Sequence, residues 1–297
     1  MILRKLNNYS LPNSQQILFN NSNFRSMKLK IKNILLISGL LVGLILSSSL
    51  MAQDKPPAKD ELTDEEKAKA NNPLASAKAL NVQYYYRPHL NEVEGGMANT
   101  NWYRLAIPTW KILWRVSAPL ETRHVNNSSE NYSKSGFGDI DIFAAYLAVM
   151  KPKFTFGIGP SAAFNTASDA ALGTGRNSLG LAAVVFAVPN PKFQTGALII
   201  WRGDIGGDDS REKVNLLALQ PFFIWQLGQG LYFRSVPVIP IDLNTGDYHI
   251  PLGMGIGKVI KINKTVFNFF IEPQPSILVK GLGQPVFQIY AALNMQF

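Results

Sequence analysis

The sequence of 297 residues has no cysteine and is poor in charge. Without cysteine the chain can form no disulfide bond, no thiolate metal site and no lipid anchor on a cysteine after a signal sequence. Charged residues make up 16% of the chain, against about a quarter in ordinary globular proteins. Helical anchors beyond residue 52 are also excluded, because no stretch there is long and apolar enough to span a bilayer as a helix.

The positive charge of the chain is concentrated at the N-terminus. Residues 1–52 hold six Lys and Arg and no Asp or Glu, which leaves 23 basic against 20 acidic residues in the rest of the chain. A basic stretch, an apolar run over residues 34–46 and small residues up to Ala52 predict a secretory signal peptide over residues 1–52. We expect translation to start at Met27, and the charge does not indicate a nucleic-acid partner.

Residues 53–78 are a charged arm between the signal peptide and the first strand. Thr63 and Glu66 are spaced as in a capping box, which predicts a short helix over residues 64–70. Because this helix has no continuous apolar face, we expect a solvated arm on the periplasmic side of a membrane.

The last eleven residues alternate strictly between apolar and mostly polar or small side chains, which is the period of a β-strand. A strand that closes a transmembrane barrel shows lipid one face and a wet lumen the other, and it can end the chain on an aromatic residue. An edge strand of a soluble sandwich fits these eleven residues equally well. As a barrel strand, it carries the expected signal for the barrel-assembly machinery at Phe287, Ile289, Leu293, Met295 and Phe297.

From residue 79 onward the sequence divides into about twelve alternating segments, within a range of ten to fourteen. A tilted strand needs about 9–11 residues to cross a bilayer, and these segments are that long. They are 79–88, 100–108, 111–121, 138–150, 153–165, 177–188, 193–203, 213–227, 230–242, 247–260, 265–279 and 286–297.

Short and long connections alternate between these segments. Tight turns fall near residues 110, 152, 190, 229 and 263, whereas longer polar stretches fall mostly at 89–99, 122–137, 166–176 and 204–212. Short periplasmic turns and long external loops are typical of outer-membrane barrels, and a soluble sandwich gives no reason for the difference. We therefore predict an all-β transmembrane antiparallel β-barrel over residues 79–297, in the outer membrane of a Gram-negative-type bacterium.

Charged side chains share one face of the predicted strands. A basic side chain that faces lipid at mid-bilayer costs about 2–4 kcal/mol, so we expect this face to line the lumen. The lumen-lining candidates are Arg87, Arg104, Arg115, Asp139, Asp141, Arg202, Gln220, Arg234, Asp242, Lys258 and Glu272. Either they fill and rigidify the lumen as pairs, or they line a narrow path that selects polar or anionic solutes. The 122–137 loop could constrict such a path.

Five motifs follow one another in the second half of the chain: G-F-G-D-I (136–140), G-I-G-P-S-A-A-F-N-T-A-S-D-A-A-L-G-T-G (157–175), L-L-A-L-Q-P-F-F (216–223), S-V-P-V-I-P (235–240) and P-L-G-M-G-I-G-K (251–258). Together they resemble a family of bacterial outer-membrane proteins often labelled "transporter" or, misleadingly, "neuromedin U". These are similar to outer-membrane proteins of phenol-degradation pathways. The resemblance covers residues 70–297 and implies an outer-membrane β-barrel with a transport role, but no substrate and no catalytic residues.

We therefore predict a passive channel or transporter for small molecules, not an enzyme, with no cofactor and no metal. The expected partners are outer-membrane lipid, the barrel-assembly machinery and an unidentified solute. A sealed structural or adhesive barrel is the alternative, and a lipid hydrolase that uses His124 with Ser128 or Ser129 is a further one. The three histidines, His89, His124 and His249, lie on the side of the predicted barrel that carries the long loops. They are far apart in the chain.

Two glycine-rich stretches could suggest a ligand site. Asp204, Asp208 and Asp209 lie among glycines, but their spacing fits no defined calcium loop, so a solvated loop is the simpler interpretation. The glycines at 253–257 do not precede a helix and so do not form a phosphate loop. They predict curvature or a close approach between strands.

Overall fold

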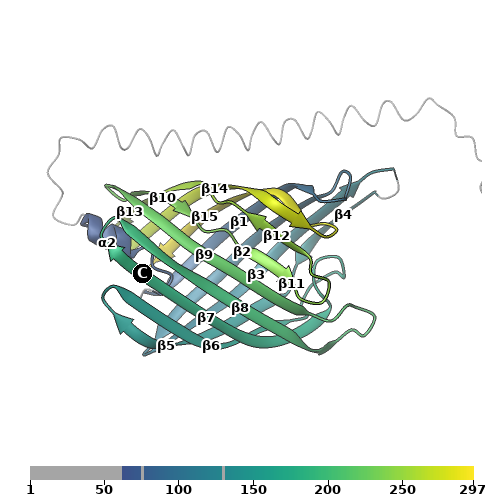
Figure 1. The fold of residues 1–297 in the computed structure, drawn as a ribbon, viewed down its shortest axis with the longest axis horizontal. Helices are drawn as coiled ribbons and strands as arrows, with labels where there is room; N and C mark the ends of the chain where they lie inside the picture. The colour runs from purple at the N-terminus through teal and green to yellow at the C-terminus, as the bar shows by residue number, and fades with distance from the viewer. Residues whose placement is uncertain (1–61, 75–76, 129–130) are drawn as a thin grey trace, which may run out of the picture. The chain divides into compact units, whose positions relative to one another are not determined.

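The computed structural model describes residues 62–74, 77–128 and 131–297 (Figure 1). The predicted signal peptide and the start at Met27 lie outside this range and stay predictions. The described elements are α2 (Asp64–Lys69), β1 (Ala79–Leu90), β2 (Met97–Thr109), β3 (Ile112–Asn126), β4 (Asn131–Phe137), β5 (Ile140–Lys151), β6 (Phe154–Phe164), β7 (Arg176–Asn190), β8 (Phe193–Gly207), β9 (Asn215–Gly228), β10 (Leu231–Ser235), β11 (Ile239–Asp242), β12 (Tyr248–Pro251), β13 (Gly255–Ile262), β14 (Thr265–Lys280) and β15 (Pro285–Gln296). No helix in this part of the chain is long and apolar enough to cross a membrane.

The strands form one antiparallel sheet that closes into a barrel (Figure 1). Each wall strand pairs with the next wall strand along the chain, and β15 pairs with both β14 and β1. β4 and β5, β10 and β11, and β12 and β13 are halves of interrupted wall strands, so the fifteen segments make a wall of twelve strands. The predicted fold class is confirmed.

The interruptions fall at glycine and proline. Gly138 and Asp139 separate β4 from β5, residues 236–238 separate β10 from β11, and residues 252–254 separate β12 from β13. The second gap contains Pro237, which has no N–H to donate to a neighbouring strand. The second and third gaps occur in neighbouring wall strands, which pair on both sides of them.

Tight turns gather at one end of the barrel and longer connections at the other, as predicted. Two-residue turns join β2 to β3, β5 to β6, β7 to β8, β9 to β10 and β13 to β14. Trp110, Gln229 and Asn263 in these turns have φ angles of 54°, 52° and 56°, the left-handed conformation that tight hairpins require. The C-terminus and α2 lie at the tight-turn end (Figure 1).

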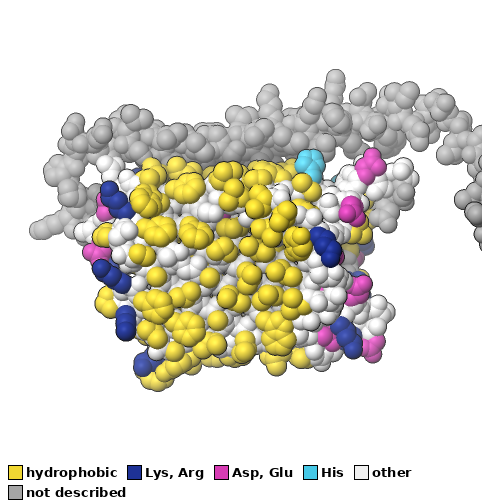
Figure 2. Space-filling model, in the orientation of Figure 1, with side chains coloured by type: hydrophobic (Ala, Val, Ile, Leu, Met, Phe, Trp, Pro, Cys, Tyr) yellow, Lys and Arg dark blue, Asp and Glu magenta, His cyan; other side chains and the backbone are white. Residues whose placement is uncertain are grey.

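The outer face of the wall is apolar, and charged side chains gather toward the two ends of the barrel (Figure 2). Large apolar side chains that are 40% or more exposed include Tyr103, Leu105, Trp114, Val116, Tyr146, Phe154, Ile158, Phe164, Ile199, Trp201, Phe223 and Trp225. These positions lie on the strand face opposite to the one that faces the lumen, as the alternation of a barrel wall requires.

The C-terminal strand β15 closes the barrel between β14 and β1. Its even-numbered side chains Gln288 and Tyr290 are buried inside, whereas Leu293 is 37% exposed on the outer face. The Tyr290 ring stacks on that of Tyr85 in β1, with 4.3 Å between the ring centroids. The alternation read from the sequence is therefore that of a closing strand.

The helix of the N-terminal arm forms as predicted, but the arm is not solvated along its length. Thr63 and Glu66 make both hydrogen bonds of the capping box. Ala68, Ala70 and Leu74 are only 6–7% exposed, and Ala70 and Leu74 belong to the apolar cluster inside the barrel. The buried apolar residues lie at the end of the helix and after it, so they form no apolar helix face.

The stretch 122–137 is a β-hairpin and not an irregular loop. β3 continues to Asn126, and residues 120–126 pair with residues 131–137 of β4. This hairpin extends beyond the loop end of the wall (Figure 1). Its described residues are not among those that line the cavity described below, and a constriction of the lumen by this hairpin stays a prediction.

Candidate lumen site

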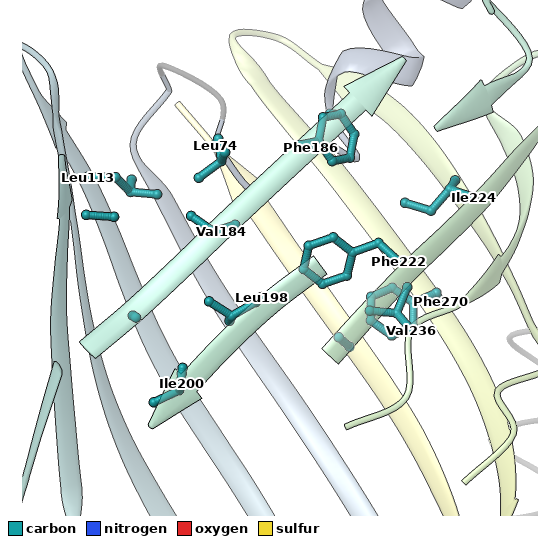
Figure 3. Close-up of a cluster of buried hydrophobic side chains, with 14 of the residues drawn as sticks. Leu74, Leu113, Val184, Phe186, Leu198, Ile200, Phe222, Ile224, Val236 and Phe270 are labelled. Atoms are coloured by element: carbon teal, nitrogen blue, oxygen red, sulfur yellow. The ribbon is translucent and has the colours of Figure 1, made fainter. Parts of the chain in front are cut away.

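A cavity of about 170 Å³ lies inside the barrel, at the end that holds the N-terminal arm. Four of the predicted lumen residues line it: Arg104, Arg115, Gln220 and Arg234. Much of the remaining wall is apolar (Figure 3), with contributions from Leu113, Phe143, Val184, Leu198, Phe222, Ile224, Val236 and Phe270. The inner face is therefore mixed, whereas the sequence had predicted a polar one.

The N-terminal arm forms one side of this cavity. Leu74 points into the apolar cluster toward Leu113 and Val184 (Figure 3). The arm's backbone is held by amide side chains of the wall. Gln194 donates to the carbonyl of Ala68 at 2.9 Å, and Gln296 and Asn268 donate to that of Ala70 at 3.0 and 3.3 Å. The arm therefore covers the lumen at the tight-turn end through few and mostly neutral hydrogen bonds.

Arg234 and Glu272 form a buried ion pair on the inner wall. Arg234 Nε donates to Glu272 Oε2 at 2.6 Å, and the side chains are 8% and 0% exposed. The second carboxylate oxygen of Glu272 accepts from the Val236 backbone N–H at 2.8 Å, beside the break between β10 and β11. Buried charges are stable only when paired and hydrogen-bonded, and both conditions hold here.

A chain of hydrogen bonds continues from Glu272 around the wall. Gln274 donates to Glu272 at 2.9 Å, and Gln288 donates to Gln274 at 2.7 Å. Arg87 then donates to Gln288 at 3.1 Å and to Thr100 at 2.8 Å, and the Thr100 hydroxyl donates to Glu121 at 2.9 Å. We call Arg234, Glu272, Gln274, Gln288, Arg87, Thr100 and Glu121 the polar chain.

Glycines of β13 and the gap before it make room for this chain. A Cβ atom at Gly253 or Gly255 would clash with Glu272, and one at Gly257 would clash with the buried ring of Tyr232. The groups that approach these glycines are side chains of the lumen, whereas the sequence had predicted curvature or a close approach between strands.

A second polar group of the lumen has few internal partners. Arg104 (β2), Ser117 (β3) and Asp141 (β5) face one another across three neighbouring strands. Arg115 lies two residues before Ser117, with its Nη2 3.8 Å from Asp141 Oδ1. Arg202 comes from β8, three strands from β5 in the sheet, and is close enough to Arg104 and Asp141 to interact with both electrostatically. We call Arg104, Arg115 and Arg202 the arginine cluster.

Three other predicted lumen residues, Asp139, Asp242 and Lys258, do not line the cavity. Asp139 accepts hydrogen bonds from the backbone N–H groups of Thr166, Ala167 and Thr174 and from the Thr174 hydroxyl, so it anchors the 165–175 loop. Asp242 accepts from the N–H groups of the turn that follows β11. Lys258 pairs in register with Leu231 and Phe269, which places it on the outer face. The strand breaks beside these positions shift the alternation on which the assignment depended.

The aspartates of the glycine-rich loop are bound by an arginine that the sequence analysis did not single out. Arg176, 4% exposed, donates to both carboxylate oxygens of Asp204 at 2.8 and 2.7 Å and to Asp209 at 2.9 Å. The neighbouring Asp208 accepts from the hydroxyl and backbone N–H of Ser210, which lowers its pKa. The loop is therefore internally braced.

The described residues contain no group of three or more acidic, histidine or cysteine side chains that could hold a metal ion. His89, His124 and His249 lie near the loop end, as expected, at the end of β1, near the end of β3 and in β12. His249 Nδ1 lies 3.0 Å from Gln284 Oε1. Ser129 falls outside the described range, and no hydrogen bond joins Ser128 to His124 within it.

Comparisons with known proteins give the fold but not the family, since no family model and no curated protein sequence matches this chain. The crystal structure of an outer membrane channel from Pseudomonas putida F1 aligns with a TM-score of 0.56 at 12% identity, over 82% of this chain and 100% of that one. The NanC and KdgM porins align with TM-scores of 0.45 and 0.41 at 11% and 9% identity, each over 73% of this chain and 98% of theirs.

At these identities the likeness shows the fold alone, which is that of an outer-membrane barrel. The closed wall and its apolar outer face agree with that fold, so the chain is an outer-membrane protein of a Gram-negative bacterium. The suggested relation to "neuromedin U" and phenol-pathway proteins stays a prediction.

Proposed function

We propose that this protein is a passive channel for small molecules across the outer membrane, held closed by its N-terminal arm. One observation carries the proposal. The lumen keeps a cavity of about 170 Å³ beside arginines with few internal partners, whereas side chains fill the interior of a purely structural small barrel. The arm covers this cavity through hydrogen bonds and a small apolar contact, which could open without unfolding the wall.

The test is solute flux through the refolded protein in liposomes, together with conductance in planar bilayers. We expect low but measurable flux, and higher flux from Leu74→Asp, because an unpaired carboxylate in the apolar cluster would expel the arm. Leu243→Asp is the matched control, since Leu243 lies in the β11–β12 connection and is 46% exposed. If neither the native protein nor Leu74→Asp passes any solute, the channel proposal is wrong.

A sealed structural barrel is the second candidate, and the apolar packing of Leu74 and Ala70 inside the wall favours it. The same experiment separates the two, because a sealed barrel gives no flux even after the arm is displaced. We propose no enzymatic activity.

We also propose outer-membrane lipid and the barrel-assembly machinery as partners. The apolar outer face supports the first. The position of β15 as the closing strand, with Leu293 and Phe297 exposed, supports the second. Serial truncation of Phe297 and Met295 tests the second: we expect slower assembly in cells, and an unchanged rate would contradict it.

A further inference from the structure

The arginine cluster lies in the lumen with very little to neutralise it. The three guanidinium groups share Asp141, whose closest approach is 3.8 Å, from Arg115, and Arg202 also interacts electrostatically with Asp139. Asp139, at the loop end, is already occupied by the four hydrogen bonds from the 165–175 loop. Like charges gathered in a partly buried place cost free energy unless something negative joins them.

The hydrogen-bond donors of the cluster are largely unused as well. Each guanidinium has five N–H donors, yet within the described residues Arg104 donates only to Gln83, at 2.8 Å, and Arg115 and Arg202 donate no hydrogen bond. The buried Nε atoms of all three arginines have no partner. The hydroxyl of Ser117, which is 0% exposed between Arg104 and Asp141, also lacks one. In native structures such buried donors are satisfied by a protein group, by ordered water or by a ligand.

The cluster meets an apolar space. Arg104 and Arg115 line the cavity together with Phe143, Leu198 and Phe222. The Arg115 guanidinium lies over the Phe143 ring, 4.2 Å from its centroid, so the charged and the apolar surfaces are continuous. A dry cavity of about 150 Å³ accepts one benzene ring, which makes 170 Å³ enough for a single ring or a short branched chain.

We propose that the arginine cluster binds the carboxylate of a small organic acid whose apolar part occupies the adjoining cavity. The planar fork of arginine matches a carboxylate with paired N–H donors, and more than one arginine is available to it here. Asp141 keeps Arg115 in place and limits the net attraction, so that the solute can leave again. The inference deepens the proposed function and depends on it for the role in transport, whereas binding itself requires no flux.

Binding is measured by isothermal titration of the full chain, refolded in detergent, with two probes of similar shape. Benzoate carries the charge, and benzyl alcohol does not. We expect benzoate to bind at least about tenfold more tightly, since charge-assisted hydrogen bonds are roughly twice as strong as neutral ones. Arg202→Gln and Arg115→Gln should each weaken benzoate about tenfold and leave benzyl alcohol unchanged.

Arg123→Gln is the matched control, because Arg123 is exposed on the same strand as Arg115 but near the loop end. It loses the same charge and should bind benzoate like the native chain. Arg115→Gln also leaves Asp141 without its partner, so Arg202→Gln decides if that variant fails to fold.

Equal binding of the two probes, or equal losses in Arg202→Gln and Arg123→Gln, would overturn the inference, as would no binding of benzoate. Benzoate binding without flux in liposomes would leave the site standing and overturn the channel. If benzoate and benzyl alcohol pass the barrel at the same rate and bind equally well, the channel proposal stands and the carboxylate site is overturned.

Discussion

The polar chain and the arginine cluster occupy the same lumen and use the same residue types, yet they differ in how fully they are paired. Arg234 makes a 2.6 Å bond to Glu272, and each neighbour along the polar chain has a hydrogen-bond partner. In the arginine cluster the nearest opposite charge is 3.8 Å away, and several N–H donors have no hydrogen-bond partner. A saturated network stabilises a structure, whereas an unsaturated one is available to a ligand.

The largest effect should come from breaking the polar chain at its charged end. Glu272→Ala leaves Arg234 buried without a counter-charge and removes the acceptor of the Val236 N–H. Loss of one partner from a buried ion pair costs about 3–5 kcal/mol, so we expect a loss of this size in equilibrium unfolding in lipid. The double variant Arg234→Met with Glu272→Leu should recover part of it, and a loss from Glu272→Ala below about 1 kcal/mol would contradict the assignment.

A smaller loss is expected in the middle of the polar chain. Gln274, which is 0% exposed, connects Glu272 to Gln288. Gln274→Ala should destabilise the barrel by about 1–3 kcal/mol in the same unfolding measurement, because it leaves neutral buried groups unpaired. Equal losses of stability in Gln274→Ala and Glu272→Ala would contradict the expectation that the charge of Glu272 makes its removal more costly.

The arginine cluster should respond in the opposite way. Arg202→Gln removes one of three like charges and breaks no hydrogen bond recorded in the described residues. We expect the free energy of unfolding to change by less than about 1 kcal/mol, or to rise, while benzoate affinity falls. A loss as large as that of Gln274→Ala would mean that Arg202 has a structural role, and the contrast between the two groups would fail.

The alternation of apolar and polar residues and the lengths of the connections were enough to predict the strands of the wall. A closed membrane barrel requires both, because each strand has one face toward lipid and the connections differ between its two ends. Arg104, Arg115, Gln220 and Arg234, which alternation assigned to the lumen, line the cavity; the first three lie well inside their strands. Alternation failed at Asp139, beside a strand break, because a break shifts the side of every residue near it.

The contribution of the N-terminal arm could not be predicted from periodicity. Leu74 is a single leucine after a short charged helix, and its partners Leu113 and Val184 come from distant strands. Gln274 and Gln288 were predictable in principle, since each lies two residues from an inward-facing neighbour, Glu272 or Tyr290. Neither carries a charge, and the prediction of lumen residues depended mainly on charge.

The hydrogen bonds of Asp139 at the loop end form a third set of polar contacts. They test whether a fully hydrogen-bonded group always stabilises the wall. Asp139→Ala removes the four hydrogen bonds to the 165–175 loop, but the wall beneath it keeps its own backbone pairing. We expect faster hydrogen exchange at the Thr166, Ala167 and Thr174 amides and little change in wall strands β5 and β6. Faster exchange throughout β5 would show that the loop and the wall unfold together.

The smallest expected effect is a pH dependence confined to the same loop. Asp169 accepts a 2.8 Å hydrogen bond from Lys134, which lowers the pKa of this carboxyl below its unfolded value of about 3.9. A lowered folded pKa means that the contact contributes fully above the unfolded pKa and is lost as pH falls through the folded one. Hydrogen exchange at Ala171, whose N–H donates to Asp169, should therefore stay slow at pH 5 and quicken only below about pH 4, relative to the intrinsic rate. Asp169→Asn should abolish that step without altering the polar chain, because the two lie in separate hydrogen-bond networks. A step in the Asn variant would assign the pH dependence to another group.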